Sequence, residues 1–300
     1  MSCEARIIGL TSWLQTPPGD CVRQWEHERL DQAVDDAFGF HAVQLGLPAL
    51  QSLRANRMPN RWVLGEMPRG SGSGGGNPGL AGLALPPLVR DGTPADGVAL
   101  RCDFDALPFP AHSIDLAVLP HTLELARDPH QTLREVERVL VPEGRLVITG
   151  FNPASAWGVR QRFGQLRQGL IAGRDTPTYL PADVEFIGYW RLRDWLRLLG
   201  FELELGRFGV YRPPWRTQRW IDRWAWIEPA GDRWWPVFGA VYLMVAVKRV
   251  RGMRLVGRLA RPARAPAASV ATVNRGGAAS RSRPDPTTTA AATVRTEDPR

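Results

Sequence analysis

The sequence is almost without lysine and has few cysteines. Lys248 is the single lysine among 38 basic residues. The three cysteines, Cys3, Cys21 and Cys102, are odd in number and lack metal-ligand spacing. They predict no disulfide framework and no zinc site, and they are typical of a reducing compartment. The longest apolar run, VFGAVYLMVAV at 237–247, is about half a membrane span, so we expect a buried strand there and no membrane span.

The first 248 residues also lack an excess of charge of either sign. The net charge of +8 arises between Arg249 and Arg300, where eleven arginines face three acidic residues. A nucleic-acid-binding fold carries its basic residues on the folded surface, so we do not expect nucleic acid as a partner. The low-complexity tail, 249–300, predicts a disordered, solvated extension, with an anchor to an anionic surface as the alternative.

The amino-terminal stretch MSCEARIIGLTSW has no basic start followed by a long apolar run. We therefore expect no signal peptide and a cytoplasmic protein. Residues 22–38 carry apolar residues at helical spacing, which predicts a helix within an N-terminal segment, 1–39.

Residues 40–248 alternate between short apolar stretches and amphipathic ones. This pattern predicts an α/β domain with a mainly parallel sheet covered by helices on both faces. We expect strands at 41–46, 61–66, 98–104, 113–120, 143–151, 201–209 and 237–247, and helices starting at 48, 128, 155 and 190. The Gly- and Pro-rich segment 67–97 interrupts the pattern as a long loop, either functional or disordered.

Several candidate site residues lie at the carboxyl ends of predicted strands or directly after them. Gly46, Glu66, Asp103 and His121 come after HAVQL, WVLG, ALRC and DLAVLP. The carboxyl ends of parallel strands form the ligand crevice of such a sheet. Two carboxylates at neighbouring strand ends suit a nucleoside, since one accepts ribose hydroxyls and the other an exocyclic amine. The alternative is that Glu66 and Asp103 are ordinary loop acids.

The stretch RCDFDALPFPAHSIDLAVLPHTLELARDPHQTLREVERVLVPEGRLVITGFNP, residues 101–153, resembles the central half of class I S-adenosylmethionine-dependent methyltransferases of the type 11, small-molecule kind. The resemblance implies a Rossmann-like sheet of seven strands ending in an antiparallel hairpin. It also implies S-adenosylmethionine as the cofactor, with Asp103 at the adenine amine and Phe104 beside the adenine ring. It places Glu66 at the ribose hydroxyls and the Gly46 turn near the methionine part.

The first turn departs from the family's pattern. Members normally read Gly-x-Gly-x-Gly there, and this chain reads GLPAL, so Gly46 alone keeps its place. Pro48 also removes a backbone donor. Leu125 stands where many relatives carry a histidine. The cofactor has no pyrophosphate to cradle, so a looser glycine requirement is physically tolerable.

Methyl transfer needs alignment of the acceptor more than an obligatory catalytic side chain. His121 is the candidate general base, because an ordinary histidine titrates near neutrality. The alternative is a histidine that bonds backbone at a helix start. A cluster of tryptophans either lines an acceptor pocket or covers the sheet: Trp215, Trp220, Trp224, Trp226, Trp234 and Trp235. Among the nearby arginines, Arg212, Arg216 and Arg219 either orient an anionic acceptor or stay solvated.

These residues predict a methyltransferase that acts on a small-molecule acceptor. The altered first turn and the 67–97 segment support an alternative, a methyltransferase-like protein that binds without turnover. A third reading is an RNA methyltransferase guided by the arginine-rich tail. It conflicts with the neutral charge of residues 1–248.

Overall fold

The computed structural model describes residues 3–67, 97–170, 179–181, 185–215 and 217–249. The insertion and the arginine-rich tail expected from the sequence lie almost entirely outside these residues. Among the described helices, none is long and apolar enough to cross a membrane.

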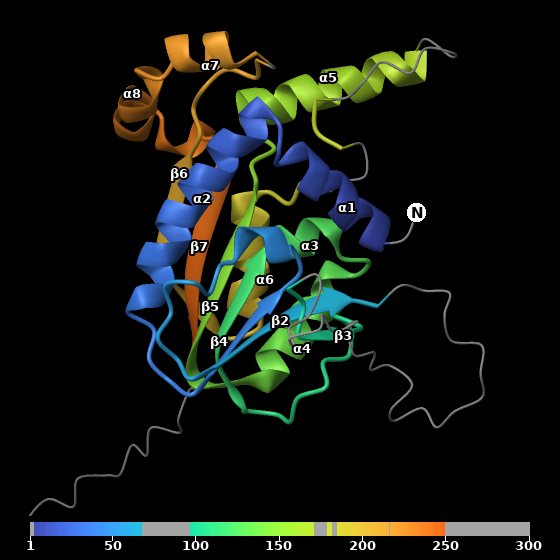
Figure 1. Ribbon diagram of the computed structural model, residues 1–300, viewed down its shortest axis with the longest axis vertical. Coiled ribbons are helices and arrows are strands. Elements are labelled where there is room, and N and C mark those ends of the chain that lie inside the picture. The colour runs from blue at the N-terminus through green and yellow to red at the C-terminus, as the bar shows by residue number, and fades with distance from the viewer. Residues whose placement is uncertain (1–2, 68–96, 171–178, 182–184, 216, 250–300) are drawn as a thin grey trace, which may run out of the picture. The chain divides into compact units, whose positions relative to one another are not determined.

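Seven strands form one sheet in the order β3-β2-β1-β4-β5-β7-β6 (Figure 1). They are β1 (His41–Leu45), β2 (Asn60–Glu66), β3 (Leu100–Cys102), β4 (Ile114–Pro120), β5 (Leu140–Phe151), β6 (Phe201–Gly209) and β7 (Val241–Lys248). The first five pair in parallel, and β7 runs antiparallel to both β5 and β6. The predicted Rossmann-like sheet with a reversed final hairpin is confirmed.

Alternate residues of the central strands pack on helices of opposite faces. Met244 and Ala246 of β7 join one core with α4 (Pro129–Val139) and α6 (Tyr189–Leu198). Leu243 and Val245 join a second core with α2 (Pro17–Asp35), which Figure 1 shows along the other face. This period of two explains why strands buried on both faces read as continuous apolar runs.

Helix α4 follows from its local sequence. Asp128 is the N-cap, and its carboxylate accepts hydrogen bonds from the backbone N–H groups of His130 and Gln131. Pro129 occupies the first turn, where its missing N–H costs nothing. The predicted start of this helix is confirmed.

The N-terminal segment contains two helices where one was expected. Helix α1 (Cys3–Trp13) precedes α2, and α2 begins at Pro17 after the extended residue Thr16. Leu10 and Leu14 are fully buried in a third core that covers the end of the sheet. The sequence of α1 carries too few apolar residues at helical spacing to reveal it.

The prediction of a helix that starts at Pro48 is wrong. Only a 3-10 turn, η1 (Pro48–Leu50), forms there, and Gln51 adopts a left-handed conformation with φ of 43°. The side-chain amide of Gln44 donates to the carbonyl oxygens of Gly46 and Leu47, and its oxygen accepts from the N–H of Ser52. These bonds hold the chain in a closed loop that replaces a helical continuation.

The other helices lie after strand ends. They are α3 (Thr122–Leu125) and α5 (Ala156–Leu170), then α7 (Gln218–Arg223), α8 (Ile227–Trp234) and the 3-10 turn η2 (Pro236–Phe238) between β6 and β7. The last three lie in the tryptophan-rich stretch between β6 and β7.

Candidate active site at the carboxyl edge of the sheet

The strand register brings the two candidate carboxylates to neighbouring positions. Glu66 of β2 pairs with Cys102 of β3, so Asp103 lies one residue beyond that pair. The N–H of Met67 donates to the Cys102 carbonyl and holds the two strand ends together. Glu66 and Asp103 are both partly buried. Two acids of this kind side by side can accept hydrogen bonds from a nucleoside.

Gly46 occupies the turn after β1 with φ of +73°, a conformation that L side chains rarely adopt. Its N–H donates to the Leu64 carbonyl at 2.8 Å. A Cβ at Gly46 would lie 3.5 Å from Thr122 Oγ1 and 3.8 Å from Phe104 Cε2, which are ordinary contacts. Backbone conformation, and not lack of space, is therefore what requires glycine.

The rest of this turn is filled by the protein's own leucines. Leu47 and Leu50 are fully buried and join the core of α1 and Phe151. Leu47 also has a positive φ, 38°, which is costly for a side chain of this size. Both leucine side chains therefore serve the packing of this core.

Phe104 belongs to the core more than to an open surface. It is 2% exposed and packs with Leu45 and Leu64 on one face of the sheet. Its ring lies beside Gly46. Asp103 next to it accepts a hydrogen bond from the N–H of Asp105 at 3.0 Å, which shapes the turn after β3.

His121 follows β4 in a left-handed conformation and is fully buried between two carboxylates. Its Nδ1 lies 2.7 Å from Glu124 Oε2, and its Nε2 lies 2.9 Å from Glu26 Oε1. Its ring also packs against Phe151, with 4.3 Å between the ring centroids. Both ring nitrogens are therefore engaged by acids of the protein itself.

Glu26 is a site residue that the sequence analysis missed. It lies on the buried stripe of α2, four residues after Val22 and four before Leu30, and is itself fully buried. Its carboxylate faces His121 Nε2 and forms an ion pair with the ring. A single acid on an otherwise apolar helical stripe was the available signal, because such an acid needs a buried partner.

The two acids set the charge of His121. Burial by itself lowers the pKa of His121, but attraction by Glu26 and Glu124 outweighs it and raises the pKa to about 10. Burial also raises the pKa of Glu124, against the opposing effects of His121 and of the Phe151 N–H, which donates to Glu124 Oε1. At neutral pH the ring is then an imidazolium that donates to both sides. Its assignment as a general base stays a prediction, and this arrangement offers no free ring nitrogen.

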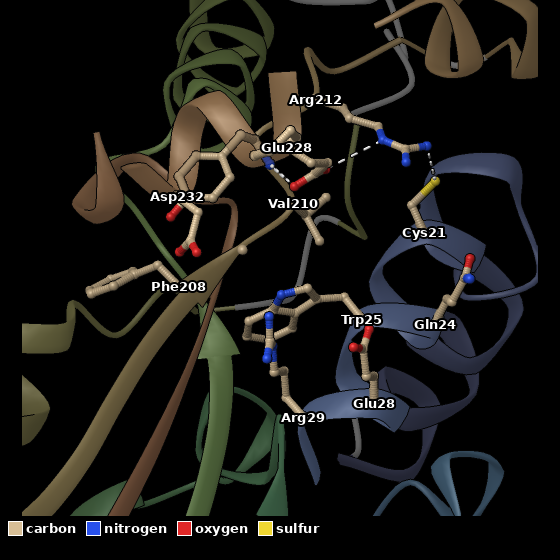
Figure 2. A pocket seen from close by; sticks show the side chains of 13 residues that line it. Cys21, Gln24, Trp25, Glu28, Arg29, Phe208, Val210, Arg212, Glu228 and Asp232 are labelled. Carbon is tan, nitrogen blue, oxygen red and sulfur yellow. Dashed lines mark hydrogen bonds and ion pairs between the residues drawn. The ribbon is translucent and has the colours of Figure 1, made fainter. Parts of the chain in front are cut away.

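A cavity of about 310 Å³ lies between α2, the end of β6 and α8 (Figure 2). Trp25, Phe208 and Tyr211 provide aromatic surface on its wall. Arg212 Nε lies 3.3 Å from Glu228 Oε1, and Arg212 Nη1 donates to Cys21 Sγ at 3.5 Å. The size is that of a small-molecule site.

The predicted tryptophan cluster does not line this cavity. Three of its members, Trp226, Trp234 and Trp235, are more than half exposed. Arg212 lines the cavity, whereas Arg219 does not, and the placement of Arg216 lies outside the described residues. Among the residues that the structure describes, no cluster of histidine, cysteine and acidic side chains could hold a metal ion.

Part of this chain is similar in sequence to known proteins. Residues 87–148 match the family described as "Methyltransferase domain". An uncharacterised Escherichia coli protein, YafS, is 40% identical over 124 residues, which cover 40% of this chain and 47% of YafS. A demethylmenaquinone methyltransferase of Thermus thermophilus is 35% identical over 122 residues, 37% of this chain and 56% of that protein. The chain thus spans about half the length of these relatives.

Similarity to solved structures is weaker. An S-adenosylmethionine-dependent methyltransferase from Mesorhizobium loti is 18% identical, with a TM-score of 0.43 over 75% of this chain and 97% of the other. The fold assignment rests on the observed strand order instead.

Proposed function

We propose that this chain, which carries a class I S-adenosylmethionine-dependent methyltransferase domain, transfers a methyl group from that cofactor to a small-molecule acceptor. The family and the cofactor expected from residues 101–153 agree with the match over 87–148. The observation that carries the proposal is the pairing of β2 with β3, which sets Glu66 beside Asp103 at the carboxyl edge.

The residues at this edge fit the cofactor. Asp103 would accept from the adenine amine and Glu66 from the ribose hydroxyls, while Gly46 lets the backbone approach the methionine part. Phe104 would support the adenine side from below, through its contact with the Gly46 turn. When bound, the cofactor supplies a methyl group already activated on a sulfonium. The task of the protein is then to orient the acceptor and exclude water.

The cavity lined by Trp25 and Arg212 is the candidate acceptor site. Its aromatic wall would bury an apolar or aromatic body, and its charged groups would orient a polar end. Burial raises the pKa of Glu228, so this carboxyl also offers a proton-binding group in the cavity. Two relatives are named as demethylmenaquinone methyltransferases, which makes quinol-type aromatics the first acceptors to try.

The test begins with calorimetry of the full chain and S-adenosylmethionine. We expect binding in the micromolar to sub-millimolar range that is usual for enzyme substrates. No heat at high micromolar cofactor, with the protein shown to be folded by circular dichroism, would contradict the proposal.

A second experiment identifies the acceptor. The protein is incubated with methyl-labelled cofactor and cell extract, and the mixture is separated into small-molecule, RNA and protein fractions. Label in the small-molecule fraction supports the proposal, and label confined to RNA supports the tail-guided alternative.

The filled first turn favours a second candidate, a protein that binds the cofactor without turning it over. Leu47 and Leu50 are fully buried in the turn after β1, and Pro48 removes a backbone donor. Cofactor binding without labelled product in any fraction supports this second candidate. Any turnover that depends on Asp103 ends it.

A further inference from the structure

Large apolar side chains are exposed at the carboxyl edge, on α5, α7 and α8 and on the residues just before and after α8. They include Phe163 and Leu166 of α5 and the tryptophans Trp220, Trp226, Trp234 and Trp235. Trp234 is 70% exposed and Trp226 64%. Exposed apolar side chains that gather in one region mark interaction sites more often than singly scattered ones do.

These elements belong to one end of the sheet. Phe151, from which the chain runs to α5, pairs with Val241 at the start of β7, and Gly209 at the end of β6 pairs with Val241 as well. Arg160 of α5 donates to the Pro214 carbonyl at 2.7 Å and ties α5 to the segment before α7. Figure 1 shows α5, α7 and α8 at the same end. We call this set of elements the Trp/Arg surface.

The charge of the Trp/Arg surface is positive. Five exposed arginines lie on it: Arg160, Arg162, Arg219, Arg223 and Arg233. Its exposed acids in the described residues of α5, α7 and α8 are Asp222 and Asp232. The Arg223 guanidinium lies 5.7 Å from the Trp220 ring centroid, a cation–π pair.

This composition matches the headgroup region of a bilayer. Tryptophan concentrates at membrane interfaces because its ring is apolar while its N–H remains polar. Arginine adds attraction to anionic headgroups and keeps its charge in water while its stem covers apolar surface. A protein partner would be expected to meet a groove or a continuous helix face, whereas here the rings are spread over several short elements.

We propose that the Trp/Arg surface docks the protein on a membrane that contains anionic lipid. This docking does not depend on methyl transfer. One further consequence does rest on the proposed function. The carboxyl edge, with Gly46 and Asp103, then lies at the membrane side, and an acceptor dissolved in the lipid reaches the site without crossing water.

Flotation of the full chain with vesicles tests the proposal. We expect the protein to float with vesicles of phosphatidylcholine mixed with phosphatidylglycerol, but not with phosphatidylcholine alone, and to be released by salt. The variant Trp226→Ala/Trp234→Ala is expected to bind the vesicles at least about tenfold more weakly, because it removes two aromatic side chains that the lipid would bury on docking. The variant Arg219→Glu/Arg223→Glu should also bind the anionic vesicles more weakly, because it replaces two positive charges with negative ones.

The matched control is Phe38→Ala/Leu198→Ala. These two side chains are as exposed as the tryptophans, but they lie before β1 and β6, at the opposite end of the sheet. The control should bind like the unchanged protein. Equal binding by the tryptophan variant would show that another part of the chain holds the lipid, and it would overturn the proposal, as would no binding by the folded protein.

Analytical ultracentrifugation tests whether the Trp/Arg surface instead binds a second copy of this chain. If the chain is dimeric by analytical ultracentrifugation and the tryptophan variant is monomeric, the surface binds a second copy and the proposal is wrong. Vesicle binding does not require methyl transfer, so its failure is separate from failure of the proposed function.

Discussion

Nε2 of His121 lies 2.9 Å from a carboxylate oxygen of Glu26, with both side chains fully buried. The contact joins α2, from the N-terminal segment, to the turn after β4. Glu124 holds the other ring nitrogen and also accepts from the Phe151 N–H at the end of β5. One histidine therefore ties together three parts of the carboxyl edge.

Replacing His121 by asparagine should strongly destabilise the fold. Asparagine tolerates the left-handed backbone there, but it leaves Glu26 and Glu124 as two buried like charges. We expect a loss of about 3–5 kcal/mol in the free energy of unfolding, measured in urea. Adding Glu26→Gln to this variant should recover part of the loss. His130→Asn, at an exposed position, serves as the control, and an unchanged stability of His121→Asn would contradict the ion-pair cluster.

The same cluster predicts how stability depends on pH. The pKa of His121 is raised to about 10 in the fold against 6.5 when unfolded, so the folded chain holds the extra proton between these values. The stabilisation is complete below about pH 6.5 and is lost as the pH rises through about 10. Burial raises the pKa of Glu124 as well, which acts in the same direction. Nuclear magnetic resonance should find the His121 ring still protonated at pH 8, and a His121 ring that titrates near 6.5 would refute this.

Asp103→Ala should weaken cofactor binding. A lost hydrogen bond to a buried group costs about 1–3 kcal/mol, or roughly five- to 150-fold in the dissociation constant. Calorimetry with S-adenosylmethionine measures it. Asp194→Ala, an exposed acid of α6, is the control. Equal affinities of the two variants would mean that the adenine binds elsewhere.

Gly46→Ala should destabilise the protein by about 1–2 kcal/mol, because the backbone there has φ of +73°. The methyl group itself has room, so the cost is conformational. Gly164→Ala lies within α5 with nothing within 4 Å of the added carbon, and it should stabilise by about 0.5–1 kcal/mol. Thermal unfolding should therefore give a lower melting temperature for Gly46→Ala and a higher one for Gly164→Ala than for the unchanged protein.

The single lysine has a structural role. Lys248 is 5% exposed, and its Nζ donates to the Leu140 carbonyl at 3.0 Å and the Glu137 carbonyl at 2.5 Å, beside the Glu137 carboxylate at 2.8 Å. It thereby satisfies carbonyl groups at the end of α4. Lys248→Met should cost about 1–3 kcal/mol of unfolding free energy, since it leaves these acceptors without a donor. A stability equal to that of the unchanged protein would show that water replaces the ammonium group.

Much of the fold could be predicted because its determinants are local. Asp128 and Pro129 start α4 by hydrogen bonds and backbone preferences within one turn. The run from Val241 to Lys248 reads as a buried strand because both its faces are covered. The predicted helix at Pro48 failed because Gln44, a residue of the preceding strand, supplies competing hydrogen bonds.

The sequence by itself determined the seven strands, the helices α4, α5 and α6, the family resemblance and the acids at the strand ends, since these follow from periodicity and from residue type next to a strand. Only the tertiary structure decided what His121 does. Its charge depends on Glu26, which α2 brings to it from a distant part of the chain. No local pattern encodes that pairing, because the field at a buried ring is set by whichever charges the packed fold places around it.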